Sequence, residues 1–165
     1  MNKILLLSFI LSCIFYTHVY PQDNYKTSML LEWGNGGNGT YTQSIGIYGH
    51  TGIVKDILYL DMGGKFIIPI KHAKNNIITQ ALLGMQIKIV DIDKKIPLFL
   101  GARGGYGWMY EKNKKMKGGV FEPFARIKIT KHLSCEYSFN YQYLGKILNT
   151  RIYSNMHEGK LIYQL

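Results

Sequence analysis

The chain has 165 residues, which suits one domain, and it carries 20 Lys and Arg residues against 10 Asp and Glu residues. Hydrophobic residues make up 47% of the sequence, yet the mean hydropathy is -0.06, so apolar and polar residues are finely mixed. Beyond the first stretch no run of about 18 apolar residues occurs, which excludes a membrane helix there. The mixture fits strands with one apolar face better than the buried core of a soluble enzyme.

The first 21 residues predict a secretory signal peptide, so we expect the folded domain to comprise residues 22–165. Lys3 supplies a positive start, residues 4–15 are largely apolar, and polar residues follow. No small-residue cleavage triplet is present, and we expect the cut between residues 17 and 22.

Two cysteines are present, and only Cys135 remains if the signal peptide is removed. One cysteine cannot form an internal disulfide, and Cys135 lies on a predicted apolar strand face, which favours a packing role. Lipidation of Cys13, as in a lipoprotein, is the less favoured alternative because the apolar segment continues past it to Tyr16.

Apolar and polar residues then alternate in eight segments, which predicts eight amphipathic strands. The clearest segment is 58–70, where every even position is non-polar and the odd positions include Asp61 and Lys65. Five of the segments are at least as long as the roughly 9 to 11 residues that a tilted strand needs to cross a bilayer. The predicted strands are 28–34, 40–50, 58–70, 77–89, 98–110, 121–130, 133–143 and 160–165.

These elements predict an all-β fold, an eight-stranded antiparallel up-and-down transmembrane β-barrel with both termini in the periplasm. Aromatic residues near segment ends, such as Tyr106, Trp108 and Tyr110, are typical of girdles at a membrane interface. The expected outer loops are 35–39, 71–76, 111–117 and 145–156, and the expected inner turns are 51–55, 91–96 and 130–132.

The signal peptide, the eight amphipathic segments, the 127–133 hairpin and the alternating carboxyl end resemble the small bacterial outer-membrane β-barrel superfamily. The start Gln22-Asp23-Asn24 is similar to those of exported Bacteroidota proteins, and the layout is loosely similar to conjugal-transfer barrels of that group. The closing Leu161-x-Tyr163-x-Leu165 is similar to the end that the barrel-assembly machinery reads, with Leu in place of the usual terminal Phe. The resemblance implies a location in the outer membrane of a Gram-negative bacterium.

The polar faces of the predicted strands carry as many acids as bases, and the lumen of an eight-stranded barrel is just wide enough for side chains to fill. Because an unpaired buried charge is costly, we expect these residues to form salt bridges that plug the lumen rather than line an ion path. The predicted network consists of Glu32, Asp61, Lys65, Arg103, Glu122, Arg126, Lys128 and Glu136.

Motifs for catalysis or cofactors are weak. The sequence Gly34-Asn35-Gly36-Gly37-Asn38-Gly39 matches G-x-G-x-x-G, but a strand pattern follows it where a dinucleotide site needs a helix, so a hairpin loop is expected. No His or Cys pair has metal-ligand spacing, and we predict neither a cofactor nor a metal. For lipid hydrolysis, only His157 with Ser154 and Glu158 offers a polar group at the outer rim, and we do not expect an enzyme.

Cations gather in the expected outer loops. The favoured interpretation is a solvated rim, and the functional alternative is contact with anionic lipopolysaccharide, for which the candidates are Lys112, Lys114, Lys115 and Lys117. A secreted chain rarely meets nucleic acid, so none is expected as a partner.

The sequence therefore predicts a non-enzymatic outer-membrane barrel that acts in envelope structure or in surface and partner interaction. The expected partners are outer-membrane lipid, lipopolysaccharide, the assembly machinery and an envelope protein. Two alternatives stay open at this point: a lipid-modifying outer-membrane enzyme, and a soluble periplasmic lipocalin-like barrel that binds a ligand with an apolar interior.

Overall fold

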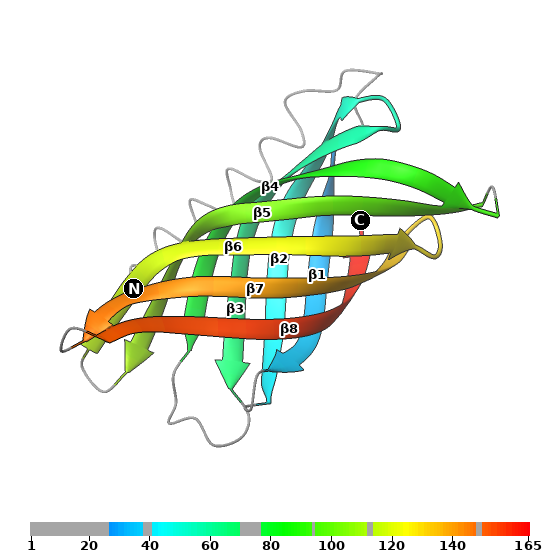
Figure 1. The fold of residues 1–165 in the computed structure, drawn as a ribbon. Helices are drawn as coiled ribbons and strands as arrows, with labels where there is room; N and C mark the ends of the chain where they lie inside the picture. The colour runs from blue at the N-terminus through cyan, green and yellow to red at the C-terminus, as the bar shows by residue number, and fades with distance from the viewer. Residues whose placement is uncertain (1–26, 38–40, 70–76, 94, 112–113, 148–149) are drawn as a thin grey trace.

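Eight β-strands close into one antiparallel barrel in chain order in a computed structural model of the protein (Figure 1). The structure describes residues 27–37, 41–69, 77–93, 95–111, 114–147 and 150–165. The strands are β1 (Thr27–Gly37), β2 (Thr42–Val54), β3 (Leu58–Pro69), β4 (Ile78–Ile92), β5 (Ile96–Glu111), β6 (Lys114–Lys128), β7 (Leu133–Ile147) and β8 (Thr150–Gln164).

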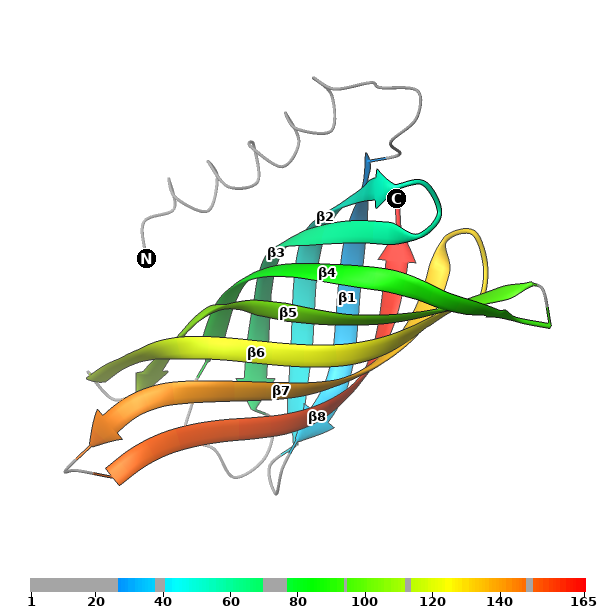
Figure 2. The ribbon, with the colours of Figure 1, turned by 45° about the horizontal axis from the view of Figure 1, so that its top comes forward.

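Pairing of the first strand with the last closes the barrel. Trp33 of β1 lies opposite Ile45 of β2 on one side and Leu161 of β8 on the other. The beginning of β1 and the end of β8 therefore meet at the same end of the barrel, which we call the terminal end (Figure 2). The expectation of a closed, eight-stranded, up-and-down antiparallel barrel is confirmed.

The expected outer loop 145–156 is wrong, because most of it is a hairpin. β7 continues to Ile147 and β8 begins at Thr150, not at residue 160. The register shifts between Tyr143 and Gly145, so a β-bulge changes the phase of the alternation there. β8 itself keeps its phase, but its outward positions Gly159 and His157 are not apolar and Met156 is buried inside, so apolar–polar alternation does not reveal this part of the strand.

Three other expected connections differ from the structure because strands continue past the last clear alternation. The expected inner turn 51–55 lies instead at residues 55–57, because β2 reaches Val54 and β3 starts at Leu58. The outer loop 111–117 is reduced by β5, which reaches Glu111, and by β6, which starts at Lys114. The inner turn 91–96 is reduced by β4, which reaches Ile92, and by β5, which starts at Ile96. The turn at 130–132 is as expected, and the Thr130 hydroxyl accepts bonds from the His132 and Leu133 amides.

Side chains alternate between the two faces of the barrel wall, and the faces differ in polarity. Along β2 the buried inward positions include Ser44, Tyr48 and His50, whereas Ile45 and Ile47 are exposed on the outside. The same alternation recurs along β4, so the outer wall is largely apolar and the interior is largely polar. The described residues include no helix that is long and apolar enough to cross a membrane.

Apolar side chains inside the barrel form two small clusters beside the polar interior. One contains Leu30, Tyr48, Leu82, Val120 and Ile162. The other contains Ile67, Ile78 and Met156, with Met109 packed against it. Ile67 lies near the end of β3 and Ile78 begins β4, so this second cluster fills the barrel toward the end opposite the terminal end.

Candidate functional site

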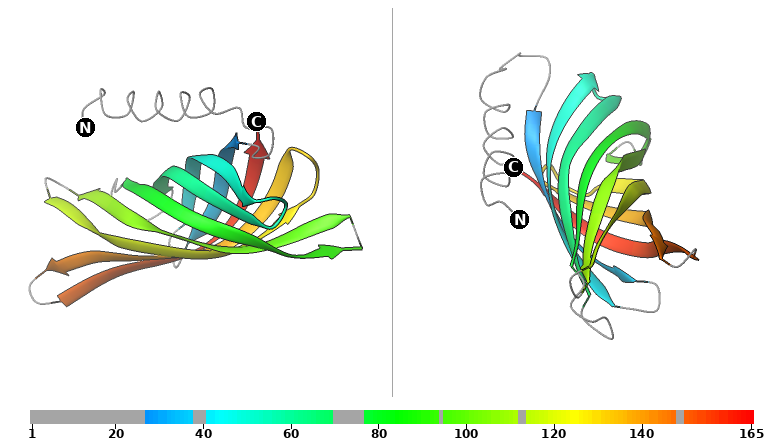
Figure 3. Two further views of the ribbon diagram at one scale, coloured as in Figure 1. Left: turned by 90° about the horizontal axis from the view of Figure 1, so that it is seen from above. Right: turned by 90° about the vertical axis from the view of Figure 1, so that its left-hand side faces the viewer.

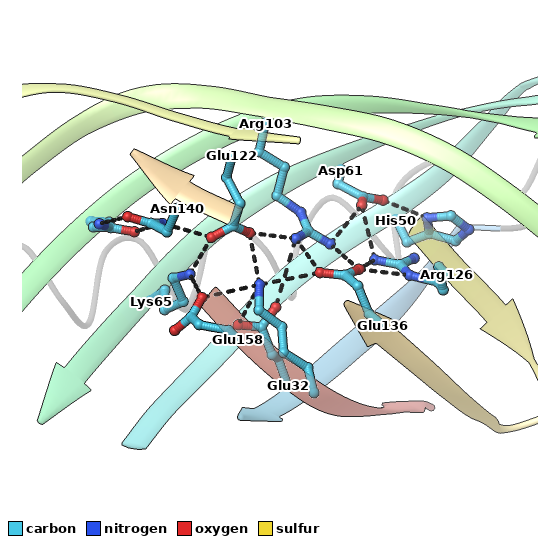
Figure 4. Close-up of polar contacts among 12 residues, drawn as sticks. Glu32, His50, Asp61, Lys65, Arg103, Glu122, Arg126, Glu136, Asn140 and Glu158 are labelled. Atoms are coloured by element: carbon cyan, nitrogen blue, oxygen red, sulfur yellow. Dashed lines mark hydrogen bonds and ion pairs between the residues drawn. The ribbon is translucent and has the colours of Figure 1, made fainter. Parts of the chain in front are cut away.

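Ionisable side chains from seven strands meet inside the barrel in what we call the interior network (Figure 4). All of them are buried, which is rare for charged groups unless they are paired. The interior network comprises Glu32, His50, Asp61, Lys65, Arg103, Glu122, Arg126, Glu136, Glu158 and Lys160.

Arg103 lies at the centre of this network. Its Nη1 donates to Glu122 Oε1 at 2.7 Å and to Glu136 Oε1 at 2.7 Å, while its Nη2 donates to Glu136 Oε2 at 2.8 Å. The Arg103 guanidinium also lies over the Tyr48 and Phe124 rings, 4.8 and 4.1 Å from their centroids. A planar guanidinium suits this position because it can bind a carboxylate with two nitrogens and contact rings with its faces.

A glycine on the neighbouring strand makes room for Arg103. Gly84 of β4 is its partner in the ladder, and a Cβ atom at Gly84 would lie 2.5 Å from Arg103 Cγ. The glycine therefore has a steric purpose at this position, and any larger residue would push the central arginine out of place.

Two lysines extend the network toward the end opposite the terminal end. Lys160 Nζ donates to Glu122 Oε1 at 2.8 Å and to Glu136 Oε1 at 3.1 Å. Lys65 Nζ donates to Glu158 Oε2 at 2.6 Å and also to Glu122. Each lysine thus joins two carboxylates from different strands.

Amide side chains continue this side of the interior network. Asn140 Nδ2 donates to Glu122 Oε2 at 2.6 Å, and Asn140 and Gln80 form a reciprocal amide pair with both distances at 3.0 Å. Gln80 also donates to Gln142 Oε1 at 3.0 Å. The amides therefore carry the hydrogen bonding away from the charged centre without adding charge.

On the other side of Arg103 the network runs toward the terminal end. Arg126 Nη2 lies 2.7 Å from Glu136 Oε2 and 3.4 Å from Asp61 Oδ2. Asp61 Oδ1 lies 2.7 Å from His50 Nδ1, and the His50 ring stacks on Tyr59 with centroids 4.9 Å apart. His50 therefore forms the outermost member of the network on this side.

Glu32 has the weakest partners of the buried carboxylates. Neither of its oxygens accepts a hydrogen bond, and its nearest cations are Lys160 Nζ at 3.4 Å and Arg103 Nη1 at 3.8 Å. Oxygens of Glu32, Glu122 and Glu136 lie within 4.8 Å of one another, a spacing that could hold a metal ion. Arg103 and Lys160 bind these same carboxylates, so the protein's own cations supply the positive charge there.

The structure brings together all but one of the residues predicted for the network. The exception is Lys128, which is half-buried at the end of β6 and donates to Gln164 Oε1 at 3.0 Å. It lies at the strand end, two residues beyond Arg126.

Three members of the interior network, His50, Glu158 and Lys160, are not in the set predicted from the sequence. Glu158 is placed there with His157 at the outer rim. Glu158 and Lys160 lie at every second position, in step with Ile162 and Gln164. This spacing could have revealed an inward face on β8.

The group considered for lipid hydrolysis is divided by the barrel wall. Glu158 points inward and binds Lys65, whereas His157 is exposed on the outside, where its Nδ1 lies 2.7 Å from Tyr137 Oη. Consecutive residues of a strand face opposite sides, so these two cannot share a site. Ser154 is described by its backbone alone.

The glycine-rich segment and the outer cations are described in part. The segment 34–37 ends β1, β2 begins at Thr42, and residues 38–40 lie outside the described chain. Lys117 is exposed on β6 opposite Trp108. Lys112 lies outside the described residues, and Lys114 and Lys115 are described by their backbone alone.

Searches for related sequences and for related structures give different results. No protein-family model and no curated protein matches the chain. Similar solved structures include a de novo designed transmembrane β-barrel, Neisserial surface protein A, and the N-terminal β-barrel domain of OprF from Pseudomonas aeruginosa.

The likeness to these structures extends over most of each chain but is low in sequence. The designed barrel has a TM-score of 0.55 at 13% identity, covering 84% of this chain and 95% of the other. Neisserial surface protein A has a TM-score of 0.56 at 13% identity, covering 86% and 94%. The OprF domain has a TM-score of 0.55 at 11% identity, covering 84% and 97%. The chain therefore has the fold of a small eight-stranded β-barrel.

Proposed function

We propose that this protein is a non-enzymatic barrel of the bacterial outer membrane, whose interior is plugged by side chains and which acts in envelope structure or surface interaction. The observation that carries the proposal is the distribution of polarity across the barrel wall. Apolar side chains cover the outside, and charged side chains fill the inside. A water-soluble barrel needs the opposite arrangement, with apolar side chains inside and polar side chains outside, because burial of apolar groups away from water stabilises the fold.

The outer wall is suited to contact with lipid. Along β4 the side chains of Leu83 and Met85 are 53% and 56% exposed, and Ile87 continues the same row. Soluble monomers rarely expose apolar patches of this extent. β4 has 15 residues, more than the roughly 9 to 11 that a tilted strand needs to cross a bilayer. Closure of the barrel also leaves no strand edge facing lipid along the paired wall.

The interior supports a plug more than an ion path. Arg103, Lys65 and Glu122 are completely buried and are held by several partners each. An eight-stranded barrel is just wide enough for side chains to fill it, so a water column would have to displace these pairs. The same polar interior is unsuited to the lipocalin-like alternative, which needs an apolar lumen for its ligand.

Export and surface contact complete the proposal. The signal peptide over residues 1–21 would deliver the chain to the periplasm, and the alternating end at Leu165 would engage the assembly machinery. Lys117, exposed on the β5–β6 hairpin, supports contact with anionic lipopolysaccharide at the cell surface. Replacing Lys112, Lys114, Lys115 and Lys117 by Gln should then weaken binding to lipopolysaccharide in a salt-dependent manner, and unchanged binding would remove that part of the proposal.

Cell fractionation combined with gel electrophoresis tests the proposed location. We expect the protein in the outer-membrane fraction, with a change in gel mobility when the sample is boiled, because a closed barrel resists unfolding by detergent at low temperature. Recovery in the soluble periplasmic fraction would overturn the proposal. Acyl release from lipopolysaccharide by the wild type, lost in a His157→Ala variant, would instead favour the lipid-modifying alternative.

A further inference from the structure

The terminal end of the barrel carries a projecting arm. The first pair between β3 and β4 joins Leu58 with Ile87, and the Ile57 carbonyl accepts a hydrogen bond from the Lys88 amide at 2.8 Å. β4 continues past this point to Ile92 and pairs only with β5, which returns from Ile96. Residues 89–93 and 95–97 therefore form a two-stranded arm that extends beyond the adjacent strands (Figure 3).

A β-bulge keeps the apolar side of this arm in line with the outer wall. The register shifts between Lys88, opposite Phe99, and Val90, opposite Leu98, so Ile89 is an extra residue. Without the bulge, strict alternation would turn Val90 and Ile92 inward. With it, the pairs Val90–Leu98 and Ile92–Ile96 continue the outward row that begins with Ile87–Leu100.

The neighbouring hairpin of the same end repeats this device. Between β2 and β3 the register shifts from Gly52–Tyr59 to Val54–Leu58, so Ile53 is the extra residue. Val54 is thereby aligned with Leu58 on the outer face. Two separate hairpins thus use an isoleucine bulge that turns the following valine outward, which points to a shared surface. We call Val54, Ile57, Val90 and Ile92 the terminal apolar rim.

The terminal apolar rim is exposed on the described chain. Val90 is 48% exposed and Ile92 is 39% exposed. The inward side of the arm is polar instead: Lys88 Nζ lies 3.1 Å from Asp91 Oδ2, and Asp91 is the partner of Pro97. The arm is therefore amphipathic in the same sense as the barrel wall.

The arm is poorly suited to pairing with a strand of another protein. A bulge at Ile89 interrupts one of its strands, and Pro97, which has no N–H to donate, lies in the other. The turn tips carry Lys55 beside Asp56 and Asp93 close to Lys95. Mixed charges of this kind suit the headgroups of zwitterionic phospholipids, which carry a phosphate and an ammonium group.

We propose that the terminal apolar rim is a membrane-binding surface, on which the β4–β5 arm and the β2–β3 turn lie against phospholipid of the periplasmic leaflet. The inference rests on the proposed membrane location and adds a specific contact to it. The rim side chains enter the upper part of the acyl layer, and Lys55 and Lys95 meet lipid phosphates. The rim would fix how deeply this end of the barrel sits in the bilayer.

Fluorescence quenching by brominated phospholipids tests the proposal in the mature barrel reconstituted into phosphatidylcholine vesicles. Trp33 and Trp108 are replaced by Phe, and single tryptophans are introduced as Ile92→Trp on the rim, Asp91→Trp on the opposite side of the arm, and Leu83→Trp on the barrel wall. Iodide on both sides of the vesicles serves as the quencher from water. Heat-dependent gel mobility confirms that each variant is folded.

We expect lipid bromines near the headgroup to quench the tryptophan of the Ile92→Trp variant, whose emission should be blue-shifted. The quenching should be about as strong as that of Leu83→Trp by the bromine position most effective for that variant. The Asp91→Trp variant should respond to iodide instead. Quenching of Ile92→Trp by iodide and not by lipid would overturn the inference, because the arm would then stand in water. Protection from both quenchers would also overturn it, in favour of cover by a second copy. A Leu83→Trp variant that lipid does not quench would overturn the proposed membrane location itself.

Discussion

Arg103 and Glu136 form a two-pronged ion pair at the centre of the barrel, with Nη1–Oε1 at 2.7 Å and Nη2–Oε2 at 2.8 Å. The two residues come from β5 and β7, the strands on either side of β6, so their pair bridges across one strand on the inside of the wall. We expect this pair to hold these strands together and to make the interior network essential for stability.

Replacing Arg103 by Met should lower the free energy of unfolding by about 3–5 kcal/mol, because it leaves Glu136 and Glu122 with fewer partners in a buried site. Urea unfolding in lipid vesicles measures the change. The double variant Arg103→Met with Glu136→Gln should recover part of the loss, since one of the stranded charges is then removed. Equal losses in the single and double variants would contradict the assigned pairing.

Glu32→Gln should have a much smaller effect than Glu122→Gln. Glu32 accepts no hydrogen bond and has cations only at 3.4 and 3.8 Å, whereas Glu122 binds Arg103 and Lys160 at 2.7 and 2.8 Å. We expect a change in unfolding free energy below about 1 kcal/mol for Glu32→Gln and several-fold more for Glu122→Gln. Both Glu→Gln changes keep the size of the side chain. A larger loss of unfolding free energy for Glu32→Gln than for Glu122→Gln would show that Glu32 has stronger partners than these distances imply.

Opening the plug should create a conductance that the wild-type barrel does not have. The double variant Arg103→Ser with Glu136→Ser removes the central pair, while Glu122 keeps Lys65 and Lys160, and Asp61 keeps Arg126. Recordings in planar bilayers should show discrete ion currents for this variant only. Currents of the same size through the wild type would contradict a plugged lumen.

The β6–β7 seam should be the least protected part of the central wall. In this ladder Phe121 pairs with Tyr141 and Phe124 pairs with Ser138, and the positions between these two pairs are unpaired. Pro123 occupies one of these positions, and it has no N–H to donate. We expect the amides of residues 139 and 140 to exchange hydrogen faster than their neighbours in mass spectrometry. A Pro123→Val change should slow that exchange and raise the unfolding free energy by about 1 kcal/mol; no effect on exchange would indicate that the seam is already closed.

The sequence was sufficient to predict the number of strands, their order and the polarity of their faces. Strict alternation in β3 and β4 carries this information, because each residue type must suit either the apolar outer wall or the polar lumen. Alternation fails over residues 150–159 of β8, where outward positions such as Gly159 and His157 are not apolar and Met156 is buried inside, so the prediction omits these residues. Glu158 is among them.

The partners within the interior network could not be predicted from the chain alone. Which acid meets which base depends on the stagger between strands that are far apart in sequence, and that stagger is set by barrel closure. Lys128 lies on the same face as Arg126 but two residues nearer the strand end, where it donates to Gln164. Alternation thus predicts which side chains enter the lumen, and three-dimensional register determines how they pair.

The most direct test of the central claim is a spin-label scan along β4 of the reconstituted barrel, with Cys135 replaced by Ala. Labels at Leu83, Met85 and Ile87 should collide freely with oxygen dissolved in lipid and hardly at all with a water-soluble nickel complex. Labels at Leu82 and Gln86, which are buried inside, should collide with neither. Nickel access at the outward positions, or the absence of alternation along the strand, would contradict a lipid-spanning barrel with a filled interior.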